Sequence, residues 1–144
     1  MVTYQEEKDL KFVEELRSIL PEHYEELSVT KSYELDPDWT RYYQFFQAGM
    51  LKSYTCREDG KLIGYVIFLV FPHLHYRTMI TAFEDIYYLR KEHRKGRVGI
   101  KLFKFVEEEL KKDGVKRIIY GTKMHMDNSR LFEYLGYSLF EKLY

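Results

Sequence analysis

The stretch from His93 to Gly99, HRKGRVG, places basic side chains and two glycines directly ahead of a helical pattern. The first turn of a helix has about four backbone N–H groups without intrahelical partners and carries the positive end of the helix dipole, so an anion is stabilised there. Gly96 and Gly99 allow an anion to approach this backbone closely, and arginine can bind phosphate through two parallel hydrogen bonds. The stretch therefore indicates a pyrophosphate site, although the same residues would also serve as a solvated connection between a strand and a helix.

Two adjacent carboxylates, Glu84 and Asp85, lie in a strand-like run that leads into this basic loop. Adjacent residues of a strand face opposite sides of a sheet, so only one of the two can enter a given pocket. Such a carboxylate can act as a general base, or it can be a buried or edge acid that holds loops in place.

The histidines of the chain offer a further kind of chemistry. His73 and His75 lie two residues apart in FPHLHY, and His125 follows a predicted strand. We expect no metal site, because this spacing is common by chance and no carboxylate partner is specified. His125 is retained as a candidate base or acceptor-site residue.

Composition limits the class of protein. The 144 residues fit one domain, and 23 basic side chains balance 23 acidic ones, so no overall positive field attracts nucleic acid or an anionic membrane. Cys56 is the only cysteine, which excludes an internal disulfide. The longest apolar run, residues 62–71, is far shorter than the roughly 20 residues of a membrane helix. We expect a protein of the cytoplasm.

Hydrophobic spacing predicts four helices. The first is expected to open with a capping box from Thr3 to Glu6 and to end at Pro21. The second is expected to begin at Asp36, as N-cap, and to end at Gly49. The other two are predicted over residues 98–114 and 128–135.

Strand patterns lie before and after the third of these helices. Two runs between residues 50 and 71 flank the hairpin dipeptide Asp59-Gly60, and a third run covers residues 76–89. Further strands are predicted over residues 115–124 and 137–144. The predicted fold is a mixed α/β sheet, in which three consecutive strands are antiparallel and helices cover the sheet.

Residues 84–118, EDIYYLRKEHRKGRVGIKLFKFVEEELKKDGVKRI, and residues 131–144, LFEYLGYSLFEKLY, resemble the GCN5-related N-acetyltransferase (GNAT) superfamily. The resemblance is closest to small acetyltransferase-like proteins encoded by bacteriophages, and the order of elements extends it over nearly the whole chain. It implies a single N-acetyltransferase domain over residues 1–144, with a mostly antiparallel central sheet flanked by helices and a splayed strand pair that forms an acyl-CoA slot.

The resemblance also implies acetyl-CoA as cosubstrate and assigns residues to it. The superfamily loop has the pattern Arg/Gln-x-x-Gly-x-Gly/Ala, matched here by Arg94, Arg97 and Gly99, with arginine in place of the middle glycine and a glycine one place earlier. Strand residues are expected to present backbone groups to pantetheine, and loop residues to surround the pyrophosphate. The expected cofactor-binding residues are Tyr87, Tyr88, Leu89, Arg94, Lys95, Gly96, Arg97, Val98 and Gly99.

For catalysis the resemblance implies Glu84 as the base and a tyrosine of the last short helix as the acid that protonates the departing thiolate. Phe132 occupies that tyrosine position here, and Tyr134, two residues on, points roughly 200° around the helix. Tyr137 is another candidate, and water can also protonate a thiolate. The expected catalytic residues are therefore Glu84, Tyr134 and His125.

These observations lead to two main hypotheses. The first is an acetyl-CoA-dependent N-acetyltransferase whose acceptor is a primary amine of a small molecule or a protein. The alternative, supported by Phe132, is an acyl-CoA-binding, weakly active or inactive GNAT-like module with a regulatory or protein-binding role. A tRNA-linked function is disfavoured by the zero net charge. We expect no membrane or metal partner, while exposed strand edges could pair copies into a homodimer.

Overall fold

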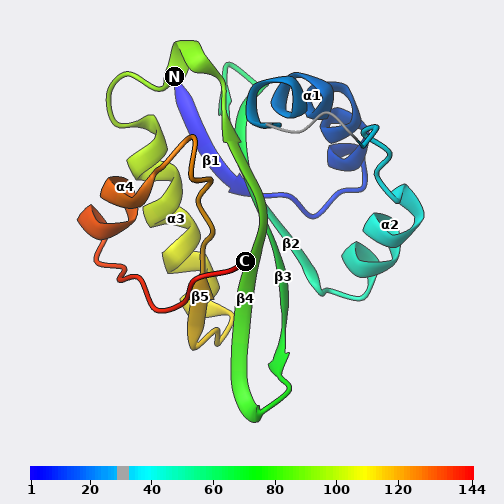
Figure 1. Cartoon of the computed structure of the whole chain (residues 1–144). Helices are drawn as coiled ribbons and strands as arrows, with labels where there is room; N and C mark the ends of the chain where they lie inside the picture. The colour runs from blue at the N-terminus through cyan, green and yellow to red at the C-terminus, as the bar shows by residue number, and fades with distance from the viewer. Residues whose placement is uncertain (29–32) are drawn as a thin grey trace.

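The computed structural model describes residues 1–28 and 33–144, which form one five-stranded sheet with helices on both faces (Figure 1). The strands follow each other across the sheet in sequence order, and only the last pair, β4 with β5, is parallel. The strands are β1 Val2–Glu6, β2 Leu51–Glu58, β3 Lys61–His73, β4 Tyr76–Leu89 and β5 Arg117–Ile119. The helices are α1 Lys11–Leu27, α2 Trp39–Gln47, α3 Val98–Lys112 and α4 Ser129–Tyr134, with a 3₁₀ turn, η1, at Lys91–His93.

The sheet separates two hydrophobic cores. Helices α1 and α2 lie on one face and α3 and α4 on the other (Figure 1). The α1/α2 core includes Phe12, Leu16 and Tyr65, and the α3/α4 core includes Val66, Phe68 and Leu102. Consecutive residues of β3 therefore enter opposite cores, which explains why this strand is apolar on both faces.

The predicted start and end of the first helix are both wrong. Residues 2–6 form β1, an edge strand that pairs antiparallel with β2, so Thr3 and Glu6 do not form a capping box. Helix α1 begins at Lys11, whose N–H donates to the Asp9 carboxylate at 2.9 Å. Pro21 lies inside α1, and the helix continues to Leu27. Burial of Leu20 and His23, on either side of Pro21, compensates for the backbone hydrogen bond that a proline removes.

The predicted hairpin is confirmed, because Asp59 and Gly60 both have positive φ, +49° and +84°, as a type I′ turn requires. Helix α2 begins two residues later than predicted: its N-cap is Asp38, whose carboxylate accepts a hydrogen bond from the Arg41 N–H at 3.0 Å.

The predicted terminal strand is wrong, since residues 137–144 have no regular secondary structure. Strand β5 is only three residues long, so it offers few backbone partners for another strand. This last segment instead packs through side chains, with the Arg117 guanidinium 4.5 Å from the ring centre of Phe140.

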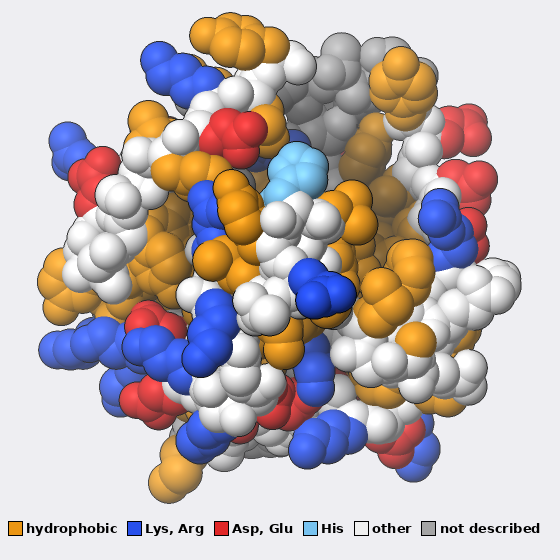
Figure 2. All heavy atoms as spheres, turned by 90° about the horizontal axis from the view of Figure 1, so that it is seen from below, with side chains coloured by type: hydrophobic (Ala, Val, Ile, Leu, Met, Phe, Trp, Pro, Cys, Tyr) orange, Lys and Arg blue, Asp and Glu red, His pale blue; other side chains and the backbone are white. Residues whose placement is uncertain are grey.

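The end of the molecule that carries the β3–β4 turn exposes apolar side chains. Figure 2, which looks at this end, shows hydrophobic side chains interspersed with lysine and arginine. Leu74 and Tyr76, in and beside the turn, are 91% and 57% exposed. Within the described ranges, no helix combines the length and hydrophobicity needed to cross a bilayer.

Candidate active site

A β-bulge in β4 decides which residues face the candidate site. Ile67 pairs with Ile86 and Phe68 pairs with Glu84, so Asp85 is the extra residue. A bulge interrupts the alternation of side chains. Tyr87 consequently packs in the α3/α4 core, the side to which Glu84 also points, whereas Ile86 packs in the α1/α2 core. Without the bulge, Glu84 and Tyr87 would face opposite sides of the sheet.

Strands β4 and β5 separate just before this bulge. They pair only from Thr81 to Phe83 of β4, and β4 then continues to Leu89 along an edge without a strand partner in the described part of the chain. The Arg90 N–H donates to the Ile63 carbonyl of β3 at 2.9 Å, so this N–H group faces β3. Along a strand the backbone N–H and C=O groups of successive residues point alternately to one neighbouring strand and to the other. The polar backbone groups of Tyr87 and Leu89 therefore face the open edge, and those of Tyr88 face β3.

Glu84 lies at the start of this opening. Its Oε2 accepts a hydrogen bond from the Gly121 N–H at 3.0 Å, and a side chain at position 121 would place its Cβ only 3.3 Å from that oxygen. Burial raises the pKa of Glu84 to about 7, while the Gly121 hydrogen bond partly opposes this shift. A carboxyl with this pKa takes up and releases protons near neutral pH, as a general base requires.

Asp85 points to the other face of the sheet, where α2 supplies its partner. The Tyr42 hydroxyl donates to the Asp85 carboxylate at 2.9 Å. The two adjacent carboxylates thus lie on opposite faces, as strand geometry predicted.

The basic loop after β4 is attached to the protein through Arg94. Its Nε donates to the Leu89 carbonyl at 2.7 Å, its guanidinium forms an ion pair with Glu26 of α1, and it lies 5.5 Å from the ring centre of Tyr88. The Tyr88 hydroxyl in turn donates to Glu22 at 3.0 Å. Arg94 and Tyr88 therefore connect the loop to α1.

The rest of the loop is open to solvent. Lys95 and Arg97 are exposed, and neither forms an ion pair with any residue that the structure describes. Gly96 has φ +100°, and Arg97 caps α3 with its backbone only. The first intrahelical bond runs from the Lys101 N–H to the Arg97 carbonyl at 2.9 Å, so three amides, Val98 to Ile100, precede it.

These features fit a pyrophosphate. The open amides and the two exposed cations lie at the same helix N-terminus, where negative charge is stabilised. Gly99 leaves room, because a Cβ there would have only Leu89 within 4 Å. The Val98 carbonyl accepts a hydrogen bond from the Tyr4 hydroxyl at 3.4 Å, which ties the start of α3 to β1.

The sequence profile of the Acetyltransferase (GNAT) family matches residues 13–137. The chain belongs to this family. A search of curated protein sequences finds no significant match. Among solved structures, a predicted acetyltransferase from Clostridium acetobutylicum with acetyl-CoA superposes with a TM-score of 0.80 at 15% identity, covering 100% of this chain and 94% of that chain.

Two further structures show the same fold. A ribosomal-protein-alanine N-acetyltransferase from Brucella melitensis biovar Abortus has a TM-score of 0.74 at 17% identity, with 100% of this chain and 96% of that chain covered. AAC(6')-Iy in complex with a bisubstrate analogue, CoA-S-monomethyl-acetylneamine, has a TM-score of 0.75 at 15% identity, with 100% and 95% covered.

Helix α4 of this GNAT protein carries a phenylalanine at the position where the resemblance implied a tyrosine. Phe132 is buried, and its ring stacks on Tyr120 with centroids 4.7 Å apart. Tyr134 is 64% exposed and points away from this cluster. His125 lies near α1, with Nε2 at 3.0 Å from the Leu27 carbonyl oxygen. Among the described residues, no hydrogen bond or ion pair joins Glu84 to Tyr134 or to His125.

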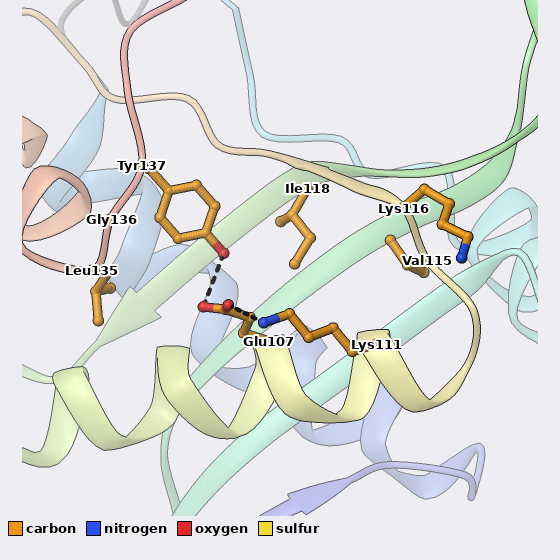
Figure 3. A pocket seen from close by; sticks show the side chains of 8 residues that line it. All are labelled: Glu107, Lys111, Val115, Lys116, Ile118, Leu135, Gly136 and Tyr137. Carbon is orange, nitrogen blue, oxygen red and sulfur yellow. Dashed lines mark hydrogen bonds and ion pairs between the residues drawn. The ribbon is translucent and has the colours of Figure 1, made fainter.

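Tyr137 lies in a different part of this GNAT fold. A pocket of about 190 Å³ opens between α3, β5 and the last segment of the chain (Figure 3). Figure 3 shows the Tyr137 hydroxyl pointing to Glu107 of α3, at 3.5 Å, and Glu107 also pairs with Lys111 at 2.7 Å. This pocket lies on the α3 side of β5 and is separate from the open edge of β4.

Two site residues carried no recognisable signal in the sequence. Gly121 supplies the N–H that binds Glu84, and Asn128 donates from Nδ2 to the Tyr87 hydroxyl at 3.1 Å. Both lie in the irregular segment between β5 and α4, where no periodic pattern indicates a direction for a side chain. The sequence predicts Gly121 within a strand over residues 115–124, and this prediction is wrong because β5 ends at Ile119.

Proposed function

We propose that this GNAT-family protein is an acetyl-CoA-dependent N-acetyltransferase that acts, as one domain, on a primary amine of a small molecule or a protein. The observation that carries the proposal is the bulge in β4. It places Glu84, with its pKa near 7, at the point where β4 and β5 separate. The similar structure with acetyl-CoA and the one with a CoA-linked aminoglycoside analogue support this choice of cosubstrate and acceptor class.

Two parts of the site would hold acetyl-CoA: the N-terminus of α3 and the edge of β4 that β5 leaves free. The amides of Val98 to Ile100, together with Lys95 and Arg97, would bind the pyrophosphate. The backbone groups of Tyr87 and the Leu89 N–H would hydrogen-bond the pantetheine arm, because they face the edge that β5 leaves free, while the Leu89 carbonyl accepts from Arg94. Bound acetyl-CoA supplies an activated acetyl group.

Glu84 would then accept the proton that the amine loses. Only a neutral amine has the lone pair that attacks the acetyl carbon, and most primary amines are protonated at neutral pH. With a pKa of about 7, Glu84 is about half ionised at pH 7 and can take up this proton, directly or through water. The Gly121 N–H holds the carboxylate in one orientation while it does so.

Calorimetric titration with acetyl-CoA, desulfo-CoA and ATP tests the cofactor assignment. We expect Arg97→Ala to weaken acetyl-CoA binding by about tenfold or more, since a hydrogen bond to a charged group contributes about 1.5–3 kcal/mol. Lys104→Ala, which removes an exposed cation farther along α3, is the matched control and should bind like the wild type. Equal affinity of Arg97→Ala and the wild type would contradict the assigned phosphate site.

Release of free thiol across a panel of primary amines tests the transfer step. We expect Glu84→Gln to bind acetyl-CoA normally and to transfer at least about 100-fold more slowly, which is the usual contribution of a general base. Asp85→Asn is the control, because Asp85 faces the other side of the sheet. A parallel loss of binding and transfer in Glu84→Gln would mean that this carboxyl is structural.

A weakly active acyl-CoA-binding module remains the second candidate function, and the burial of Phe132 favours it. The position that would carry a hydroxyl on α4 is filled by a ring packed against Tyr120 and Phe103. Acetyl-CoA binding without thiol release from any amine would support this second function.

A further inference from the structure

Acetyl transfer leaves a thiolate that needs a proton. Helix α4 carries Phe132 at the position where the resemblance implied a tyrosine, and its only tyrosine, Tyr134, is 64% exposed. Three tyrosine rings contact the Phe132 ring, with centroid distances of 4.7 Å to Tyr120, 5.8 Å to Tyr87 and 6.3 Å to Tyr137. The directions of their hydroxyls decide which of them can reach the open edge of β4.

Two of these hydroxyls are directed away from that edge. Tyr137 points to Glu107 on the α3 side of β5 (Figure 3). The Tyr120 ring is enclosed by Phe68 and Phe103, and its hydroxyl is shielded from solvent beside that of Tyr137. Tyr120 lies near Glu84, but its hydroxyl is directed to Tyr137 rather than to the open edge of β4.

The third hydroxyl, that of Tyr87, lies at the open edge itself. The backbone of Tyr87 faces the edge where β5 has separated, and its hydroxyl meets Asn128 in the segment that leaves β5. The side chain therefore spans from β4 to the far side of the opening. The bulge at Asp85 also turns Tyr87 to the face that carries Glu84.

The Tyr87 hydroxyl has two polar neighbours. Asn128 donates from Nδ2 to the Tyr87 oxygen at 3.1 Å, so the contact with Asn128 does not use the hydrogen of the hydroxyl. The Thr122 side chain also hydrogen-bonds this hydroxyl, and its oxygen can accept that hydrogen until a thiolate takes its place. Burial raises the pKa of Tyr87, although the hydrogen bonds with Asn128 and Thr122 partly oppose this shift. The hydroxyl is therefore protonated at neutral pH. The Asn128 amide would also stabilise the phenolate that remains after the proton has left.

We propose that Tyr87 takes the place of the absent α4 tyrosine and protonates the thiolate that leaves acetyl-CoA. This inference rests on the proposed acetyltransferase function. When the tetrahedral adduct collapses, the carbon–sulfur bond breaks, its electron pair moves to sulfur, and the Tyr87 hydroxyl proton is transferred to that sulfur. The proton lost by the amine goes to Glu84, and the Tyr87 phenolate recovers a proton from water.

Coenzyme A and desulfo-CoA, which differ only at the sulfur, test this contact without turnover. We expect wild-type protein at pH 9 to bind coenzyme A about tenfold more tightly than desulfo-CoA, because a hydrogen bond to an ionised group stabilises the thiolate. Tyr87→Phe should abolish this preference while leaving the affinity for desulfo-CoA unchanged. Tyr120→Phe is the matched control, since it also loses a hydroxyl beside Phe132 and should keep the preference.

The kinetics of acetyl transfer then distinguish two roles for Tyr87. It could act as the catalytic acid, or it could only connect β4 to the start of α4 through its hydrogen bond with Asn128. Tyr87→Phe should lower kcat about 100-fold with little change in the KM for acetyl-CoA. Introducing Phe132→Tyr into this variant should restore at least a tenth of the wild-type kcat, because it returns a hydroxyl next to the lost one. Removing a tether would instead lower thermal stability, and a second hydroxyl at position 132 would not rescue it.

Two results would overturn the role of Tyr87 as the acid. An unchanged kcat in Tyr87→Phe, or a preference for coenzyme A that persists in this variant, would overturn the role of Tyr87 while leaving the proposed function in place. Failure of wild-type protein to bind any form of coenzyme A would overturn both. Loss of folding in Tyr87→Phe is detected by thermal unfolding, and Asn128→Ala then serves as the second variant, with the same lost preference expected.

Discussion

Replacing Glu84 with glutamine should stabilise the protein at pH 8, although it should also slow acetyl transfer. Glu84 is held in a partly buried position, and among the residues that the structure describes only the Gly121 N–H donates to its carboxylate. Burial raises its pKa from 4.5 to about 7. The ionised form is therefore less stable in the folded protein than in the unfolded chain, and glutamine removes this cost.

The gain in stability can be calculated from the linkage between proton binding at Glu84 and the free energy of unfolding. Between pH 4.5 and pH 7 the folded state binds more protons at Glu84 than the unfolded state does, so stability falls as the pH rises through this window. At about 1.4 kcal/mol per pH unit, the loss approaches about 3 kcal/mol at pH 8. The variant lacks this loss, so its advantage over wild type should grow from pH 4.5 to pH 8 and then remain constant.

Urea unfolding of both proteins at several pH values measures this difference. With a denaturant slope of about 2 kcal/mol per molar, the variant's midpoint at pH 8 should exceed that of wild type by about 1.5 M. Glu108→Gln, on the exposed face of α3, reports the effect of removing a solvated carboxylate. A difference between Glu84→Gln and wild type that does not change with pH would refute the assigned burial of this carboxylate.

Three further predictions concern stability. Gly64→Ala should destabilise the protein by about 1–3 kcal/mol, because a Cβ there would lie 2.9 Å from the sulfur of Cys56. Gly99→Ala should be tolerated, because the nearest atom to a Cβ at that position is 3.6 Å away. Thermal unfolding of the two variants and the wild type tests this difference. His23 is buried and its pKa is lowered to about 4, so wild-type stability should fall as the pH drops from 6.5 to 4, and His23→Gln should flatten this dependence in urea titrations. Arg57→Met should cost about 3 kcal/mol by leaving two carboxylates without their shared cation, and a smaller loss in a denaturant titration would show that they are readily solvated.

The local elements with strong side-chain signals could be predicted from the sequence. The Asp59-Gly60 turn was predicted from its backbone requirement, and α3 from its apolar face. The ends of α1 could not be predicted, because short-range signals at Thr3 and Pro21 were overridden by pairing with β2 and by packing against the sheet. The segment after α4 carries apolar residues typical of a strand, but a strand also needs a partner, and β5 offers only three residues.

The sequence by itself determined which chemical groups are available: a basic, glycine-containing loop before a helix, two adjacent carboxylates, and phenylalanine at position 132. Only the tertiary structure decided how they are used. One extra residue at Asp85 turns Glu84 and Tyr87 to the same face, and an ion pair with α1 engages Arg94 while Arg97 stays open. Strand pairing and long-range ion pairs join residues far apart in the chain, and neither hydrophobic period nor motif spacing contains that information.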